Sequence, residues 1–138
     1  MPLVFGTVQT LKAGSAVGTN MSGASVPGTE GTVTFGSSSS LWGSSWTYSD
    51  INASDFGLNI GIFALVGTSD HLRATNFGFS IPSNETISGI QFDVVAKSTG
   101  AGTSSAVISI NYVSCTITTA AGATYTSMGQ FFPFIYSA

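Results

Sequence analysis

The sequence predicts an all-β protein that folds as a single β-sandwich of the jelly-roll type. Apolar side chains recur at every second position in several segments, which is the pattern of half-buried strands. Short stretches rich in Gly, Ser, Thr and Asn separate these segments, and such residues favour turns. A chain of 138 residues forms one domain by default and is long enough to bury a core. About seven or eight strands at this spacing, without a helix, are typical of a sandwich or barrel.

The clearest pair of strands is predicted between residues 69 and 97. Alternating apolar residues run through 77–81, before a central Pro82–Glu85 segment, and through 90–96 after it. The proline has a fixed φ and the following asparagine tolerates positive φ, so the chain can reverse there. We therefore expect either a hairpin or a tight corner at this segment.

Residues 1–30 are predicted to form an extended N-terminal arm, and residues 31–138 to form the sandwich. Residues 3–11 are β-branched and apolar enough for a strand that pairs at a sheet edge or against a neighbouring molecule. Residues 12–30 are mostly Gly, Ser, Ala and Thr without a period, which is typical of a flexible linker. The residues expected to contact a partner here are Leu3, Val4 and Phe5.

Three large aromatic residues, Trp42, Trp46 and Tyr48, lie close together in the sequence. Buried rings contribute strongly to a core or an interface, so we expect a structural corner packed by the tryptophans. The alternative is an exposed aromatic platform for sugars, which would need several fixed polar groups around it.

The polar segment Ser49–Asp55 favours a turn or a single helical turn. Asp50, Asn52, Ser54 and Asp55 offer oxygen atoms at a spacing that begins like a calcium-binding EF-hand loop. The glycine and the final glutamate of such a loop are missing. We predict no metal site, with calcium as the alternative.

Three further strands are predicted in the rest of the chain. The alternation in 56–66 shifts phase at Phe63, which indicates a bulge or a strand buried on both faces. In 106–119, Tyr112 shares a face with Ile110, and Val113 and Cys115 lie on the other. The final strand, 124–136, ends in QFFPFIY, where we expect interface contacts through Phe131, Phe132, Phe134 and Tyr136.

Charge is scarce. Only 7% of the residues are charged and 43% are hydrophobic, whereas about a quarter of an ordinary soluble domain is charged. A chain with so few charges has little to keep it dispersed as a monomer. Its three basic residues, Lys12, Arg73 and Lys97, are not clustered as nucleic-acid binding requires, and no apolar run approaches the ~20 residues of a membrane span. We expect protein partners and no nucleic acid or membrane.

The sequence predicts no catalytic residues and no cofactor. His71 is the sole histidine, so a Ser-His-Asp site would need it together with Asp70 or another acid. Asp70 would point to the opposite face of a strand, which excludes the simplest version of such a site. One histidine and one cysteine cannot make a zinc tetrad. The single Cys115 excludes an internal disulfide and is expected to be a buried thiol.

Two segments resemble structural proteins of tailed bacteriophages and related viruses. The segment SDHLRATNFGFSIPSNETISGI is similar to the "S-x-x-L-x-A-T-x-F-G-F-x-I-P-x-x-x-T-I-x-G-I" pattern of their β-sandwich modules. The segment LWGSSWTYSDINASDFG is similar to their "L-W-G-x-x-W-T…D-I-N-x-S-x-F-G" pattern. Together the two segments lie within residues 41–97.

The resemblance implies a virion component and a β-sandwich. The function expected is that of a capsid decoration (cement) or minor capsid protein, located at the capsid surface of the virion. It would assemble as a homo-oligomer, with a trimer favoured, and contact the major capsid protein or other virion proteins. The alternatives are a phage tail or fibre component, or a carbohydrate- or receptor-binding β-sandwich.

Overall fold

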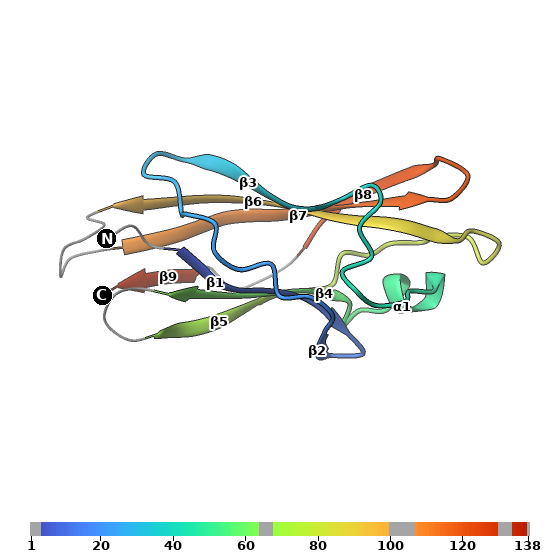
Figure 1. The fold of residues 1–138 in the computed structure, drawn as a ribbon, viewed down its shortest axis with the longest axis horizontal. Helices are drawn as coiled ribbons and strands as arrows, with labels where there is room; N and C mark the ends of the chain where they lie inside the picture. Colours follow the sequence, from blue (N-terminus) through green and yellow to red (C-terminus); the bar gives the residue numbers. More distant parts are fainter. Residues whose placement is uncertain (1–3, 64–67, 100–106, 130–133, 138) are drawn as a thin grey trace.

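The chain folds as a β-sandwich, seen here in a computed structural model that describes residues 4–63, 68–99, 107–129 and 134–137 (Figure 1). Two antiparallel sheets form its two layers. The four-stranded sheet has the order β2-β1-β4-β5, and the five-stranded sheet the order β3-β6-β7-β8, with β9 also paired to β7. The elements are β1 (Val4–Lys12), β2 (Ser15–Val17), β3 (Gly31–Ser37), α1 (Tyr48–Asn52), β4 (Gly57–Phe63), β5 (Thr68–Ala74), β6 (Ile87–Thr99), β7 (Val107–Thr119), β8 (Thr124–Met128) and β9 (Phe134–Ser137).

The predicted all-β sandwich is confirmed, whereas its jelly-roll form is not. Consecutive strands form hairpins within one sheet at β1–β2, β4–β5, β6–β7 and β7–β8. Only β1–β4 and β3–β6 are non-consecutive neighbours along the described sheet orders. A jelly roll is built from two Greek keys, each with a strand that returns by a long connection. The sandwich is instead dominated by local hairpins.

An aromatic cluster fills the space between the sheets. The Phe56 ring is fully buried and lies 5.6 Å from Trp46, 6.0 Å from Phe77 and 5.9 Å from Phe92 between ring centroids. These rings come from the loop before α1, from the crossing after β5 and from β6. Each ring contributes on the order of 1.5–3 kcal/mol by burial. The cluster therefore joins both sheets and the irregular segments between them.

The segment expected to be an extended arm is instead part of the sandwich. β1 lies between β2 and β4 in the four-stranded sheet, and its Phe5, Val8 and Leu11 are fully buried. The irregular chain that follows β2 folds back along β1, where the amides of Phe5 and Met21 donate to the carbonyls of Ala24 and Val8. The lack of periodicity in residues 12–30 reflects this irregular pairing, and the predicted boundary between an arm and a sandwich domain at residue 30 is wrong for the described residues.

The segment around Pro82–Glu85 is a corner and not a hairpin. Residues 77–81 alternate between buried and exposed but pair with no strand, because the chain here crosses from the four-stranded to the five-stranded sheet. The amide of Glu85 donates to the Pro82 carbonyl at 3.1 Å and closes the turn. Alternation of apolar and polar residues therefore indicates an extended backbone between the core and solvent, but it does not show that the segment pairs with another strand.

In two strands, β4 and β7, a bulge changes which residues face the core. The register of β4 against β5 shifts between Gly61 and Phe63, which confirms the bulge predicted from the phase change there. In β7, Ile110 pairs with Ala96 and Tyr112 with Val95, so Asn111 is the extra residue. Because of this bulge, Ile110 points into the core together with Val113 and Cys115. The sequence pattern had placed Ile110 on the opposite face from these two residues.

The turn between β1 and β2 is built on two residues with positive φ, Ala13 at 52° and Gly14 at 80°. Positive φ at both central positions defines the type I′ hairpin turn, which favours Asn-Gly. Ala is a poor residue for the first position because its Cβ disfavours the left-handed region.

The substitution Ala13→Asn is expected to raise the free energy of unfolding by about 0.5–1 kcal/mol, since Asn adopts positive φ more readily than Ala. Urea unfolding curves measure the change. Ala121→Asn, at an exposed turn position outside the positive-φ residues, is the control and should leave stability nearly unchanged. A destabilised Ala13→Asn variant would contradict the assigned turn.

Candidate functional site

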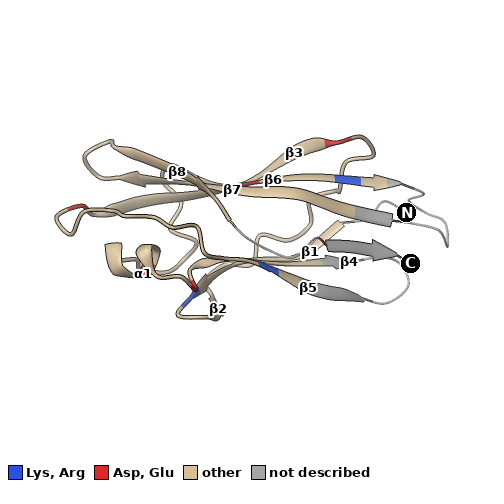
Figure 2. Cartoon of the chain, turned by 180° about the vertical axis from the view of Figure 1, so that it is seen from behind, with Lys and Arg blue, Asp and Glu red and all other residues tan. Residues whose placement is uncertain are grey.

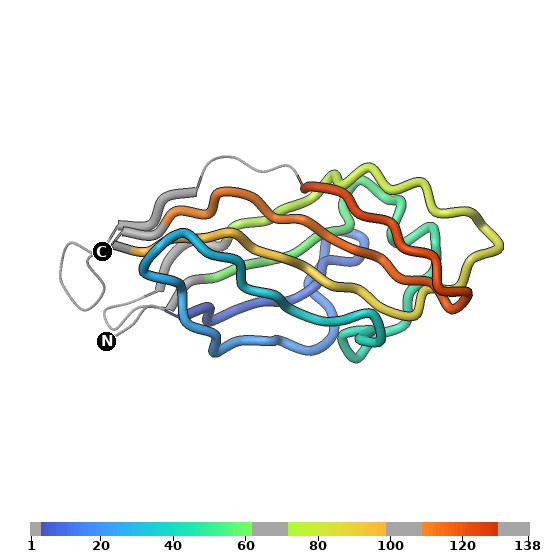
Figure 3. Tube along the Cα trace, turned by 90° about the horizontal axis from the view of Figure 1, so that it is seen from above, coloured from blue at the N-terminus to red at the C-terminus, as the bar shows by residue number. Residues whose placement is uncertain are grey.

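The outer face of the five-stranded sheet is the candidate interaction surface (Figure 3). Successive side chains of a strand point to opposite faces, so the residues that alternate with core residues point away from the sandwich. We call this surface the outer face. It carries Thr32 and Thr34 on β3; Gln91, Asp93, Val95 and Lys97 on β6; Tyr112, Ser114, Thr116 and Thr118 on β7; and Thr124, Thr126 and Met128 on β8.

Polar side chains on the outer face form hydrogen bonds with one another, both within a strand and between neighbouring strands. The Thr34 hydroxyl donates to Asp93 Oδ1 at 2.6 Å, and Gln91 Nε2 donates to Asp93 Oδ2 at 3.3 Å. The hydroxyls of Thr116 and Thr126, on neighbouring strands, lie 3.1 Å apart. Such pairs satisfy polar groups within the face, which lowers the cost of removing it from water.

Three apolar side chains cross this face. Val95 on β6 is the register partner of Tyr112 on β7, and Met128 on β8 is the partner of Ser114, so Met128 lies diagonally next to Tyr112. Tyr112 is 37% exposed and Met128 is 55% exposed, whereas Val95 is 6% exposed. We call Val95, Tyr112 and Met128 the apolar stripe. Tyr and Met are enriched in protein interfaces.

Few residues of the two sheets are charged (Figure 2). On the outer face, Asp93 and Lys97 lie on β6, and Glu30 lies one residue before β3. Glu30 Oε1 accepts a hydrogen bond from Asn111 Nδ2 at 3.0 Å. Lys97 is exposed, and no hydrogen bond or ion pair joins it to another described residue. The rest of the outer face is uncharged, which keeps the desolvation penalty of contact low.

The tryptophans form a buried corner and not a sugar platform. Trp42 is 1% and Trp46 is 7% exposed. The Trp42 indole donates to the Ile90 carbonyl at 2.9 Å, and the Trp46 indole to the Leu41 carbonyl at 2.9 Å. Of these three residues only Tyr48 is exposed, so the tryptophans form the expected structural corner, and the three residues do not present the alternative platform for ring stacking.

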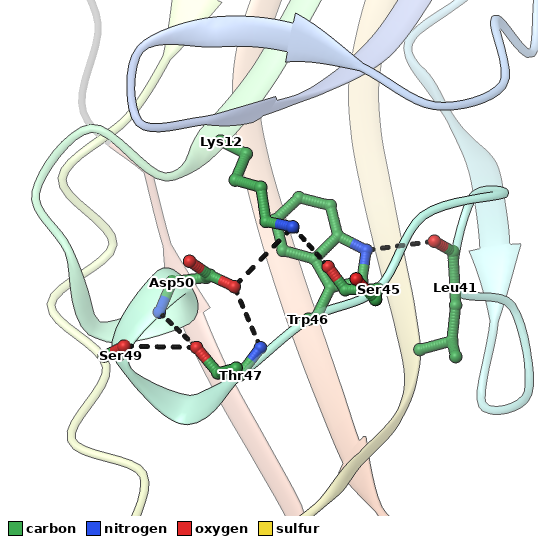
Figure 4. A network of polar contacts seen from close by, with 7 residues as sticks. All are labelled: Lys12, Leu41, Ser45, Trp46, Thr47, Ser49 and Asp50. Carbon is green, nitrogen blue, oxygen red and sulfur yellow. Dashed lines mark hydrogen bonds and ion pairs between the residues drawn. The ribbon is translucent and has the colours of Figure 1, made fainter.

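Lys12 closes this corner from the side of the hairpin (Figure 4). Its Nζ lies 5.1 Å from the Trp46 ring centroid and 3.7 Å from Asp50 Oδ2. The Asp50 carboxylate also accepts from the Thr47 amide at 2.9 Å and forms a capping box with Thr47 at the start of α1. The network fixes local structure, because each polar group is used within it.

The calcium alternative does not fit the arrangement of its oxygens. Asn52 Oδ1 accepts from the Ile81 amide at 2.8 Å, and Asn52 Nδ2 donates to the Ile81 carbonyl at 3.0 Å. Asp50 is held by Thr47 and Lys12. Asn52 therefore clasps the crossing segment against α1, and its side-chain oxygen is directed to an amide.

The cysteine is enclosed in the core. Cys115 is fully buried in β7, and desolvation by burial, together with the nearby Asp93 carboxylate, raises the pKa of its thiol well above the ordinary value. A protonated, enclosed thiol is a poor nucleophile. Cys115 packs as a small apolar residue, as the sequence predicted.

Most of the residues expected at an interface have another environment or lie outside the description. Phe5 is fully buried and Val4 half-buried in β1, because that strand belongs to the four-stranded sheet. Phe134 and Tyr136 pair through their backbones with β7. Leu3, Phe131 and Phe132 lie outside the described residues, as do the side chains of Phe134 and Tyr136.

The described part of the chain holds no group of three His, Cys, Asp or Glu side chains that could bind a metal ion. Within the same part, no helix is long and apolar enough to cross a bilayer. No protein-family model matches the sequence, and comparison with curated proteins and with solved structures finds no significant match.

The substitution Asn52→Ala removes both hydrogen bonds to Ile81 and leaves that buried peptide unsatisfied. We expect the free energy of unfolding to fall by about 2 kcal/mol. Thermal unfolding followed by circular dichroism measures this loss. Asn84→Ala, at an exposed turn position, is the matched control; equal stability of the two variants would show that the clasp contributes nothing.

The Cys115 thiol is expected to react with a thiol reagent only when the protein unfolds. Its raised pKa keeps it protonated at neutral pH, and its folded-state burial blocks access. Labelling with a disulfide reagent at pH 7, with and without denaturant, gives the two rates. Rapid labelling of the native protein would disprove the enclosed position.

Proposed function

We propose that this chain is a non-enzymatic structural protein that docks through its outer face in a multi-subunit assembly. The observation that carries the proposal is the apolar stripe, which runs from β6 to the edge strand β8 and is exposed at Tyr112 and Met128, beside the hydrogen-bonded pairs Thr34–Asp93 and Thr116–Thr126. Large hydrophobic side chains surrounded by polar groups are the usual arrangement of a protein interface.

The resemblance of residues 41–97 to tailed-phage structural proteins favours a virion component as the specific form of this function. In that setting the protein is a decoration (cement) or minor capsid protein at the capsid surface, in contact with the major capsid protein. A tail or fibre component is the second candidate. Both positions use the same chemistry, in which apolar area is buried across subunit boundaries.

The mechanism is mechanical. Each copy buries its stripe against a neighbour, and the hydrogen bonds Thr34–Asp93 and Thr116–Thr126 keep these polar groups paired when water is excluded. A single contact of this kind is weak, but many copies on one shell act together by avidity. The fold supports this because β6 and β7, each 13 residues long, give the face a continuous backbone.

Charged residues in the stripe are expected to prevent docking. In the double substitution Tyr112→Asp and Met128→Asp, binding to shells of the major capsid protein encoded in the same genome should weaken at least about tenfold, as for loss of an interface hot spot. Co-sedimentation with shells measures binding.

Ser83→Asp, at the exposed Pro82–Glu85 turn, adds a charge away from the outer face and should bind like the wild type. The melting temperatures of both variants should match the wild type, since the changed side chains are exposed. Unchanged binding of the double variant would refute docking through the stripe.

A further inference from the structure

We propose that the outer face binds a second copy of this chain, face to face, about a twofold axis that passes over β6 at the level of Val95. This inference rests on the proposed function, because it uses the same face for docking but names a second copy of the chain, in place of the major capsid protein, as the partner that covers it. The charge pattern of β6 carries it: the outward residues are Asp93, Val95 and Lys97 in sequence, an acid and a base on either side of the apolar stripe.

The twofold axis lies midway between the two packed sheets and runs perpendicular to their strands. It therefore places each strand opposite the same strand of the second copy, in the antiparallel direction. Under that operation Val95 meets Val95 of the second copy, and Asp93 meets Lys97 of the second copy twice. An isologous interface requires such self-complementarity, in which residue i contacts j and j contacts i. Packed sheets lie about 10 Å apart, a gap that a lysine and an aspartate can bridge.

The strands next to β6, which are β3 and β7, are also compatible with this twofold axis. Thr32, Val95 and Tyr112 are register partners across β3, β6 and β7, so all three lie along the axis and each meets its own copy. Tyr112, which is 37% exposed, then packs against a second tyrosine ring, an arrangement that adds to burial. Glu30, one residue before β3, comes to face the Thr34 hydroxyl of the second copy.

Asp93 and Lys97 are both available for this contact. The one ion pair within the described residues joins Lys12 to Asp50, while Lys97 is exposed and has no partner among them. Asp93 accepts from Thr34 and Gln91, and a carboxylate has about four acceptor positions. Within the described part of the chain, Lys97 therefore has no group of opposite charge beside it, and Asp93 has acceptor positions left for the lysine of a second copy.

The alternative occupants are less complementary. A neighbour whose face carries charges of one sign would set like charges against Asp93 or Lys97, which disfavours the contact. A wholly apolar neighbour would bury both charges without partners, at a larger cost. A second copy supplies the opposite charge at each position by symmetry.

Charge reversal tests the pairing. Wild-type protein should form a dimer with a dissociation constant in the micromolar range, measured by size exclusion with light scattering over a concentration series. Asp93→Lys and Lys97→Glu should each weaken that dimer at least about tenfold, because each sets like charges together twice. The double variant D93K/K97E restores complementarity and should dimerise like the wild type.

A mixture of the two single variants gives the decisive result. One chain then carries two bases and the other two acids, so they should form a heterodimer although each is monomeric alone. This recovery also shows that both variants are folded. The proposal is overturned if the wild type is monomeric or trimeric over the series, if the single variants dimerise as well as the wild type, or if the mixture stays monomeric.

The two proposals fail in different ways. If Tyr112→Asp with Met128→Asp abolishes shell binding while the charge variants leave a monomeric protein unaffected, docking through the face holds and the second copy is not its partner. If the charge swap behaves as expected and shell binding is unaffected by the stripe variants, the pairing holds and the face does not serve the shell.

Discussion

Everything else in this molecule depends on the ring cluster around Phe56. Its fully buried ring lies against four aromatic side chains from three separate parts of the chain, at centroid distances between 5.6 Å and 6.3 Å. Edge-on and tilted rings of this kind add about 0.5–1.5 kcal/mol per pair beyond their buried area. Because both sheets and the crossing segment meet at this ring, their separation and alignment are set there.

The cluster also fixes which residues can face solvent. Because the side chain of Phe92 lies in the core and successive side chains of β6 point to opposite faces, Gln91 and Asp93 point outward. The bulge at Asn111 does the same for Tyr112, since it brings Ile110 and Val113 into the core. The stripe and the charge pattern of the outer face follow from core packing, and an insertion or deletion in β6 or β7 would move them to the other face.

The sequence alone predicted the sandwich because alternation and turn residues are local signals. It also predicted the buried tryptophan corner and the enclosed cysteine, which depend on side-chain chemistry. It failed where a result depends on pairing partners: residues 77–81 alternate as a strand does but cross between sheets, and residues 12–30 have a linker's composition but follow β1. The outer face did have a local signal, since the pattern Thr-x-Thr occurs at 32–34, 116–118 and 124–126, yet only the register places these on one surface.

The course of the N-terminal segment changes how such a chain can assemble. Strand exchange needs a free arm, and β1 is already paired on both sides, with its Phe5 and Val8 in the core. To release it would expose those side chains and break a sheet, at a cost comparable to a large part of a domain's stability. Contact between finished surfaces has no such cost. A face with few charges can be covered by a neighbour while the sandwich beneath stays intact, so the proposed docking needs no exchanged strand.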